Sequence, residues 1–155
     1  MQGGFERLWK TNARVRTGLG CPLRGESLGQ AAEQVFESGT MYWWGQNQQI
    51  YVLSGTRGGS FSAYPNTWRE GEELAELDPP SGLHAPVRGF GKVWRNYPAV
   101  NDALGWALRP EAAIKGVYQR YEKGTMLWSP AANGHAARIY VLFSDGSFAV
   151  YPDVE

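Results

Sequence analysis

The sequence lacks several features that would point to a particular class of protein. Cys21 is its only cysteine, so no intrachain disulfide can form, and we expect this side chain to fill space. The 15 basic and 15 acidic residues cancel and form no basic face for nucleic acid. No apolar run approaches the roughly 18 residues that cross a bilayer. The N-terminus shows no basic-then-apolar signal pattern. We therefore predict neither nucleic-acid binding nor a membrane span.

Signatures of catalysis are missing as well. The two histidines, His84 and His135, do not have the spacing of metal ligands. The sequence contains no GxSxG elbow, P-loop or HExxH motif. These absences predict a protein that is not an enzyme and that uses no metal and no cofactor.

The chain does contain a repeated unit, which is present in two copies. Residues 4–44 align without a gap on residues 89–129, and the match resumes in the Ile-Tyr-Val-Leu segments that start at Ile50 and Ile139. A unit of about 65 residues is near the lower limit for independent folding, so we expect the two copies to share a core. Small repeats usually build binding surfaces. The predicted division is a first unit at 4–68, an acidic and proline-rich linker at 69–86, and a second unit at 87–155.

Each unit is predicted to begin with helices and to continue as strands. Phe5, Leu8 and Trp9 lie at i, i+3 and i+4, which places them on one face of a helix. A second short helix is expected at 13–19 and again at 98–104, and alternating polarity follows in both copies. The predicted fold class is α+β, with two tandem repeats that pack with pseudo-twofold symmetry. Each repeat would consist of two short helices plus an antiparallel β-meander.

Part of the second unit resembles a known family. The run 118–130 reads Tyr-Gln-Arg-Tyr-Glu-Lys-Gly-Thr-Met-Leu-Trp-Ser-Pro and is followed by Asn-Gly-His-Ala at 133–136, which resembles the core of the LGFP repeat. In the first unit, 19–22 matches that family's Leu-Gly-x-Pro motif, whereas the second unit lacks the proline and the first lacks the Trp-Ser-Pro element. LGFP repeats occur in bacterial cell-envelope proteins, often beside a catalytic domain. The resemblance implies a non-catalytic module that binds cell-wall glycan.

The seven Trp, eight Tyr and six Phe residues divide into those that recur and those that do not. Trp43 recurs as Trp128, so both are expected in the core. If Met41 and Trp43 face the core, Tyr42 and Trp44 are partly exposed on the other side of the strand. Exposed aromatic rings can stack on sugars while amides bind the hydroxyls. The alternatives are packing against the other copy and contact with a protein partner. The predicted ligand-binding residues are Tyr42, Trp44, Gln46, Asn47, Trp106, Tyr118 and His135.

Charged residues also recur between the copies. The recurring pairs are Glu26/Glu111, Glu37/Glu122 and Arg24/Arg109. Two carboxylates can hydrolyse a glycosidic bond, so catalysis of glycoside hydrolysis by these glutamates is an alternative hypothesis. A structural role is simpler, and we expect the arginine two residues before Glu26 or Glu111 to brace the loop between them.

The function that these observations favour is non-catalytic binding of a polysaccharide or cell-wall glycan. The near-neutral charge favours a neutral glycan. We expect an accessory module of a larger extracellular or cell-surface protein, partnered with a catalytic domain of that protein, because the second copy stops short of the position where the first continues to Trp68. The runner-up is a protein-interaction or structural surface-anchoring module, and a cell-wall hydrolase is third.

Overall fold

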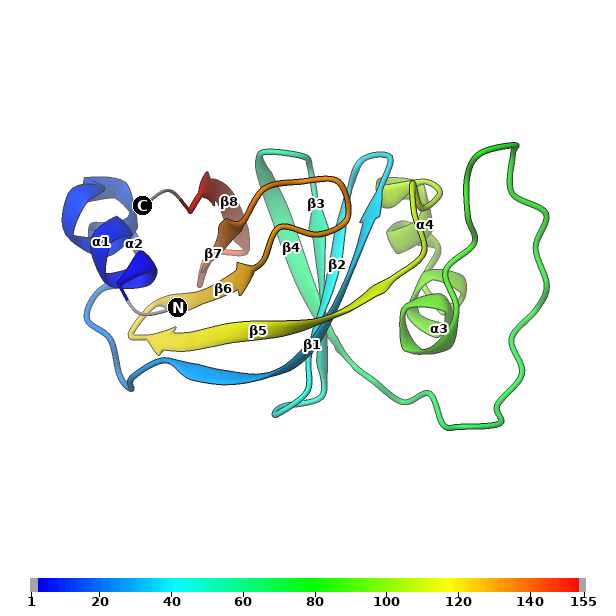
Figure 1. Ribbon diagram of the computed structural model, residues 1–155, viewed down its shortest axis with the longest axis horizontal. Helices are drawn as coiled ribbons and strands as arrows, with labels where there is room; N and C mark the ends of the chain where they lie inside the picture. The colour runs from blue at the N-terminus through cyan, green and yellow to red at the C-terminus, as the bar shows by residue number, and fades with distance from the viewer. Residues whose placement is uncertain (1–2, 154–155) are drawn as a thin grey trace.

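The structure, a computed structural model, describes residues 3–153. Two helices and four strands form a first half, and the same order recurs in a second half (Figure 1). The first half contains α1 (Gly4–Thr11), α2 (Ala13–Leu19), β1 (Ser27–Phe36), β2 (Gly39–Trp44), β3 (Gln49–Ser54) and β4 (Gly58–Pro65). The second half contains α3 (Arg88–Asn96), α4 (Pro98–Leu104), β5 (Ala112–Tyr121), β6 (Gly124–Ser129), β7 (Arg138–Phe143) and β8 (Ser147–Pro152). The short helices expected at 13–19 and 98–104 are confirmed.

The eight strands form one closed antiparallel barrel in the order β1-β2-β3-β4-β8-β7-β6-β5. Within each half, consecutive strands pair as hairpins. The halves join where β1 pairs with β5 and where β4 pairs with β8. The strand order is unchanged when every strand is exchanged for its counterpart in the other half. Residues in the two halves can therefore be compared position by position.

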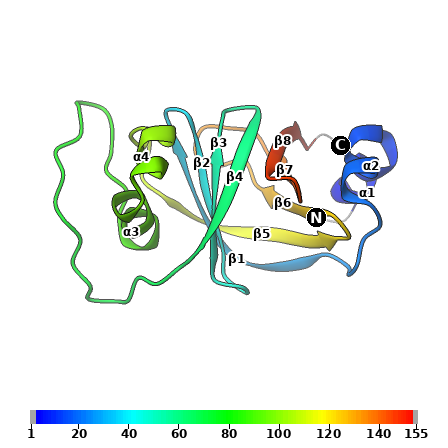
Figure 2. The same cartoon turned by 180° about the vertical axis from the view of Figure 1, so that it is seen from behind.

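The predicted α+β class, with two helix-plus-meander units, is wrong. The protein is mostly sheet, and its strands close into a single barrel with the helices at two opposite ends (Figures 1 and 2). An isolated four-stranded meander leaves the backbone groups of two edge strands unpaired, and pairing across the halves satisfies them. The sequence pattern specified hairpins inside one copy but not the pairing of edges between copies.

Each helix pair covers strands of the opposite half. Phe5 and Leu19 from the first helix pair share a core with side chains of β5, β6, β7 and β8. Phe90 and Leu104 from the second pair share a core with side chains of β1, β2 and β3. Because each half supplies the cover for the other, removal of one half would expose the outer core of its partner.

The two helices of each pair are held together by an indole and a glycine. Trp9 donates its indole N–H to the carbonyl of Gly20 at 2.8 Å, and Trp94 donates to Gly105 at 2.9 Å. Both glycines have positive φ, 72° and 74°, which suits a helix stop. Asn12 begins α2 by accepting a backbone N–H on its side chain.

A third core fills the barrel interior, and it corrects an expectation about β2. Met41 faces the helices, whereas Tyr42 and Trp44 face the interior, where they pack with residues such as Tyr140 and Phe148. Tyr42 is 0% exposed and Trp44 is 1% exposed, so the expectation of partly exposed side chains is wrong. Both faces of β2 are covered because the barrel has an interior and a helix covers its outside.

Residues 66–87 join the two halves and loop around the outside of α3 (Figure 1). Along this stretch of the described chain, ladder pairing is limited to an isolated bridge between His84 and Ala107. The division into units at 4–68 and 87–155 with a linker at 69–86 stays a prediction. Among the described helices, none has the length and apolar character needed to cross a membrane.

Candidate functional site

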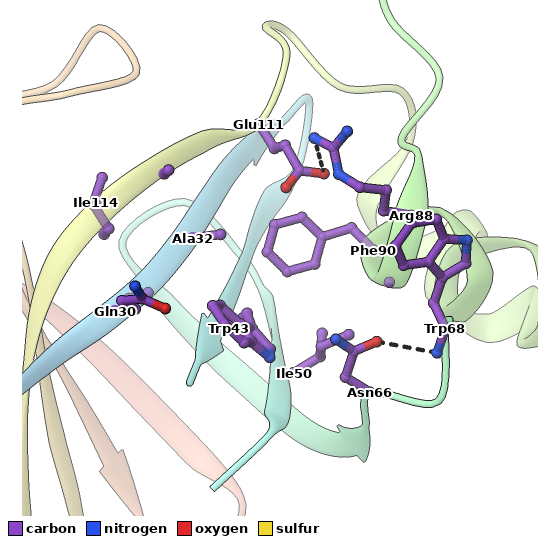
Figure 3. A pocket seen from close by; sticks show the side chains of 13 residues that line it. Gln30, Ala32, Trp43, Ile50, Asn66, Trp68, Arg88, Phe90, Glu111 and Ile114 are labelled. Carbon is purple, nitrogen blue, oxygen red and sulfur yellow. Dashed lines mark hydrogen bonds and ion pairs between the residues drawn. The ribbon is translucent and has the colours of Figure 1, made fainter. Parts of the chain in front are cut away.

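A cavity of about 470 Å³ opens between the outside of the barrel and the start of α3 (Figure 3). We call it the Trp43 pocket. Its size falls in the range of about 300–1,000 Å³ that is typical of small-molecule sites. The side chains that matter for its chemistry are Trp43, Asn66, Trp68, Arg88, Phe90 and Glu111.

Aromatic side chains from three separate segments line this pocket. Trp43 lies on the outer face of β2, Trp68 follows β4, and Phe90 lies in the first turn of α3. Figure 3 shows Trp43 and the Phe90 ring pointing into the same cavity. Phe90 is held by the core under α3, while Trp68 is anchored by its indole N–H, which donates to the Glu72 carbonyl at 3.2 Å. The pocket therefore has apolar walls on a rigid support.

The Trp43 indole N–H is buried and has no hydrogen-bond partner among the described residues. Its counterpart Trp128 donates to Asp153 at 2.8 Å. The residue matched to Asp153 is Asn66, since each follows a Tyr-Pro pair. The Asn66 side-chain oxygen instead accepts the backbone N–H of Trp68 at 3.2 Å (Figure 3). A buried donor without a partner costs about 1–3 kcal/mol, which a ligand oxygen would recover.

Glu111 supplies the charge of the pocket. The Arg88 guanidinium lies 3.5 Å from its Oε1, an ion pair without hydrogen-bond geometry, and this oxygen is otherwise buried and unpaired among the described residues. Burial raises the pKa of Glu111 above its ordinary value of 4.5, and the charge of Arg88 only partly opposes this rise. The pocket wall thus carries one unpaired donor, Trp43 Nε1, and one acceptor, Glu111 Oε1, that is ion-paired with Arg88 without a hydrogen bond.

The recurring carboxylates Glu37 and Glu122 have structural partners. Glu37 accepts the backbone N–H of Trp106 at 2.9 Å, and Glu122 accepts that of Cys21 at 2.7 Å, so each bridges the two halves. The expectation that an arginine two residues upstream braces Glu111 is wrong. The ion-pair partner of Glu111 is Arg88, the first residue of α3.

Two small residues of the Trp43 pocket stand where the other half has larger ones. Ala32 matches Val117, and Ala113 matches Leu28, in the gap-free part of the repeat. Both alanines line the cavity. At the matched place Val117 is buried, whereas Leu28 is 63% exposed, and Gly3, Glu26 and Leu28 line a separate cavity of about 540 Å³.

Four of the predicted binding residues lie together around a second cavity of about 480 Å³, and they are Trp44, Gln46, Asn47 and Tyr118. The Trp44 and Tyr118 rings stack at a centroid distance of 5.4 Å and an interplanar angle of 8°. The other three lie elsewhere. Tyr42 is inside the barrel, where its hydroxyl donates to the Trp128 carbonyl at 2.7 Å. Trp106 packs on Trp94 with centroids 5.1 Å apart, and His135 lies against Glu33.

The sequence analysis missed Glu33, which is fully buried on β1. Its carboxylate accepts hydrogen bonds from Ser129 Oγ at 2.8 Å and from Tyr140 Oη at 2.5 Å, and it contacts His135 Nε2 at 2.8 Å. The other ring nitrogen of His135 lies 2.7 Å from the carbonyl of Ala136. Both ring nitrogens of His135 therefore lie at hydrogen-bond distance from oxygen atoms.

Burial by itself raises the pKa of Glu33, but the hydrogen bonds from His135, Tyr140 and Ser129 outweigh it, and the pKa lies below the ordinary 4.5. Asn133 adds a contact of 3.2 Å to the same carboxylate. The network ties the β6–β7 loop to β1. The sequence signal was available, since Glu33 replaces the matched Tyr118.

The residues of the Trp43 pocket were missed because they recur. Because Trp43 and Glu111 recur in the second copy or the first, the sequence pattern favours a structural role for both. The useful signal was the set of neighbours that differ between copies, namely Ala32 against Val117 and Asn66 against Asp153.

No three His, Cys, Asp or Glu side chains of the described residues gather into a potential metal site. In the comparisons with known proteins, no family model, no curated protein and no solved structure matches the chain. The resemblance to the LGFP repeat therefore stays a prediction.

Proposed function

We propose that the protein is a non-catalytic carbohydrate-binding module and that the Trp43 pocket holds one sugar ring. The observation that carries the proposal is an unpaired indole donor in a cavity with aromatic walls, beside a buried carboxylate oxygen that makes no hydrogen bond. A sugar has apolar C–H faces that suit Trp43 and Phe90. Its hydroxyls both accept and donate, so they match Trp43 Nε1 and Glu111 Oε1.

The charge of the pocket favours an uncharged sugar. Glu111 and Arg88 are the charged side chains among the described lining residues, and their opposite charges form an ion pair, so the wall carries no net charge. The amide groups of Gln30 and Asn66 also line the cavity and offer further hydrogen bonds to hydroxyls.

A binding role fits the pocket better than hydrolysis does. Glycosidases of both stereochemical classes generally use two carboxyl groups that flank the bond, and the Trp43 pocket contributes one. The wider proposal is an accessory module of an extracellular or cell-surface protein that brings a catalytic domain to a glycan. The alternative is a protein-interaction or surface-anchoring module.

The test is co-sedimentation with insoluble cellulose, chitin, xylan and bacterial cell wall. We expect the protein to pellet with one of them, and Trp43→Phe, which removes the free indole N–H, to weaken that binding about tenfold. Trp128→Phe is the matched control because it removes an indole N–H that already has a partner, and it should bind like the wild type. Absence of pelleting across the panel would favour the protein-interaction alternative. Equal binding by the Trp43 variant would refute the assignment of the site.

A further inference from the structure

The second cavity has a chemical character different from that of the Trp43 pocket. It lies beside the segment before β1, the β2–β3 turn and the end of β5, and its volume is about 480 Å³. Arg24 and Arg120 line it together with Gln46, Asn47 and Tyr118. We call it the two-arginine pocket.

In the other half, the matched place is filled by the chain itself. The β6–β7 loop spans residues 130–137, whereas the β2–β3 turn spans only residues 45–48. The longer loop brings Asn133 and His135 onto Glu33. Glu33 matches Tyr118, so the carboxylate that receives this loop is absent from the two-arginine pocket. One end of the barrel is covered by its own loop, and the matched end is open.

The charge around the open end is positive. Arg24 and Arg120 are exposed, and no carboxylate is found among the described residues that line the cavity. Burial is the main cause that raises the pKa of the Tyr51 hydroxyl to about 12. Asn47 donates to the same hydroxyl at 3.0 Å. The two guanidinium groups and the Gln46 and Asn47 amides therefore line the same cavity.

We infer that the two-arginine pocket binds the carboxylate of an acidic sugar residue. This inference rests on the proposed function and adds a second subsite to it. Guanidinium groups pair with carboxylates through charge-assisted hydrogen bonds, and the half-buried Tyr118 ring and the Gln46 and Asn47 amides suit the rest of a sugar. The zero net charge of the chain does not oppose this, because the charge that a ligand meets is that of the pocket.

The test is an NMR titration with sodium glucuronate, glucose or sodium sulfate at matched ionic strength and neutral pH. The indole signal of Trp44 and the side-chain amide of Asn47 report on the two-arginine pocket. We expect glucuronate to shift both with an affinity about tenfold tighter than that of glucose, as one charge-assisted contact predicts. Equal affinity for glucose would overturn the preference for an anion. Equally tight binding of sulfate would overturn the assignment to an acidic sugar.

The variant Arg24→Gln with Arg120→Gln should reduce the affinity for glucuronate to that for glucose. Both residues are exposed, so the fold should persist. Arg109→Gln is the matched control, since Arg109 is the counterpart of Arg24 and lies beside Gly134 of the β6–β7 loop. An equal loss in this control would overturn the inference. The Trp43 indole signal reports separately on the Trp43 pocket. If glucose shifts this signal while glucuronate does not shift the Asn47 signal, the second subsite is refuted and the proposed function stands.

Discussion

Two tyrosines at matched positions provide a sharp test of the Glu33 network. Tyr140 on β7 donates to Glu33 Oε2 and accepts from Arg138 Nε at 2.8 Å. Tyr51 on β3 accepts from the exposed Asn47 amide at 3.0 Å. Both side chains are buried, at 1% and 8% exposure. Tyr140→Phe and Tyr51→Phe therefore delete the same atom from the same place in the repeat, but only the first deletion removes a donor from a buried charge.

The expected costs differ because of that charge. A hydrogen bond to a charged group contributes about 1.5–3 kcal/mol, whereas one between neutral groups contributes about 0.5–1.5 kcal/mol. For a chain of this size, 1 kcal/mol changes Tm by about 2–4 °C. Tyr140→Phe should lower Tm by about 3–12 °C and Tyr51→Phe by about 1–6 °C. The Asn47 amide left behind in the second variant can turn to water.

The difference should also depend on pH. The pKa of Glu33 is lowered in the folded state, so its contribution to stability is complete above the ordinary value of 4.5 and is lost as the pH falls through the lowered pKa. The donor from Tyr140 helps to lower that pKa. The gap between the two variants should therefore be widest near neutral pH and should narrow towards about pH 3.

The assay is urea unfolding of the wild type and both variants at pH 7 and near pH 3. Unchanged slopes would show that the free energies of unfolding can be compared. Equal destabilisation by the two substitutions at pH 7, or a gap that stays the same at both pH values, would refute the assignment of Glu33 as a buried charge held by Tyr140.

Three further substitutions test the pocket and the core. Ala32→Val installs the side chain found at the matched position, Val117. It should raise the free energy of unfolding by about 1–1.5 kcal/mol and reduce pelleting with the glycan. Unchanged pelleting would contradict the pocket assignment. Gly116→Ala would place a methyl group 2.3 Å from the Tyr42 hydroxyl and should cost about 1–3 kcal/mol in urea unfolding; a cost below about 0.5 kcal/mol would contradict that packing. Phe5→Ala should cost about 3–5 kcal/mol and increase amide exchange in β5, β6 and β7; increased exchange confined to the first half would contradict the crossed arrangement of helices and strands.

Local structure was predictable from the sequence where one segment determines it. The helices at 13–19 and 98–104 followed from turn residues and apolar spacing, and the structure has both. The pairing of β1 with β5 was not predictable, because the alternation in each strand is satisfied by any neighbour of suitable register. The closed barrel depends on that pairing.

The same limit affected the candidate site. Trp44 and Tyr118 were selected as unmatched aromatics, and they do lie together, but Trp44 is buried because β2 is covered on both faces. The indole N–H of Trp43 is free because the Asn66 side-chain oxygen accepts the backbone N–H of Trp68 instead. Trp68 lies beyond the end of the β-meander. Such a choice between two partners is made by tertiary structure and leaves no periodic signal in the sequence.

If the Trp43 pocket binds a sugar through its unpaired indole N–H, the chemical shift of that proton must change when the sugar binds. An oligosaccharide of the glycan that pellets the protein would be titrated while all indole N–H signals are followed by NMR. The Trp43 signal should move downfield as it gains an acceptor, while the Trp128 signal, already bonded to Asp153, should stay in place. A stationary Trp43 signal at saturating oligosaccharide would contradict the claim.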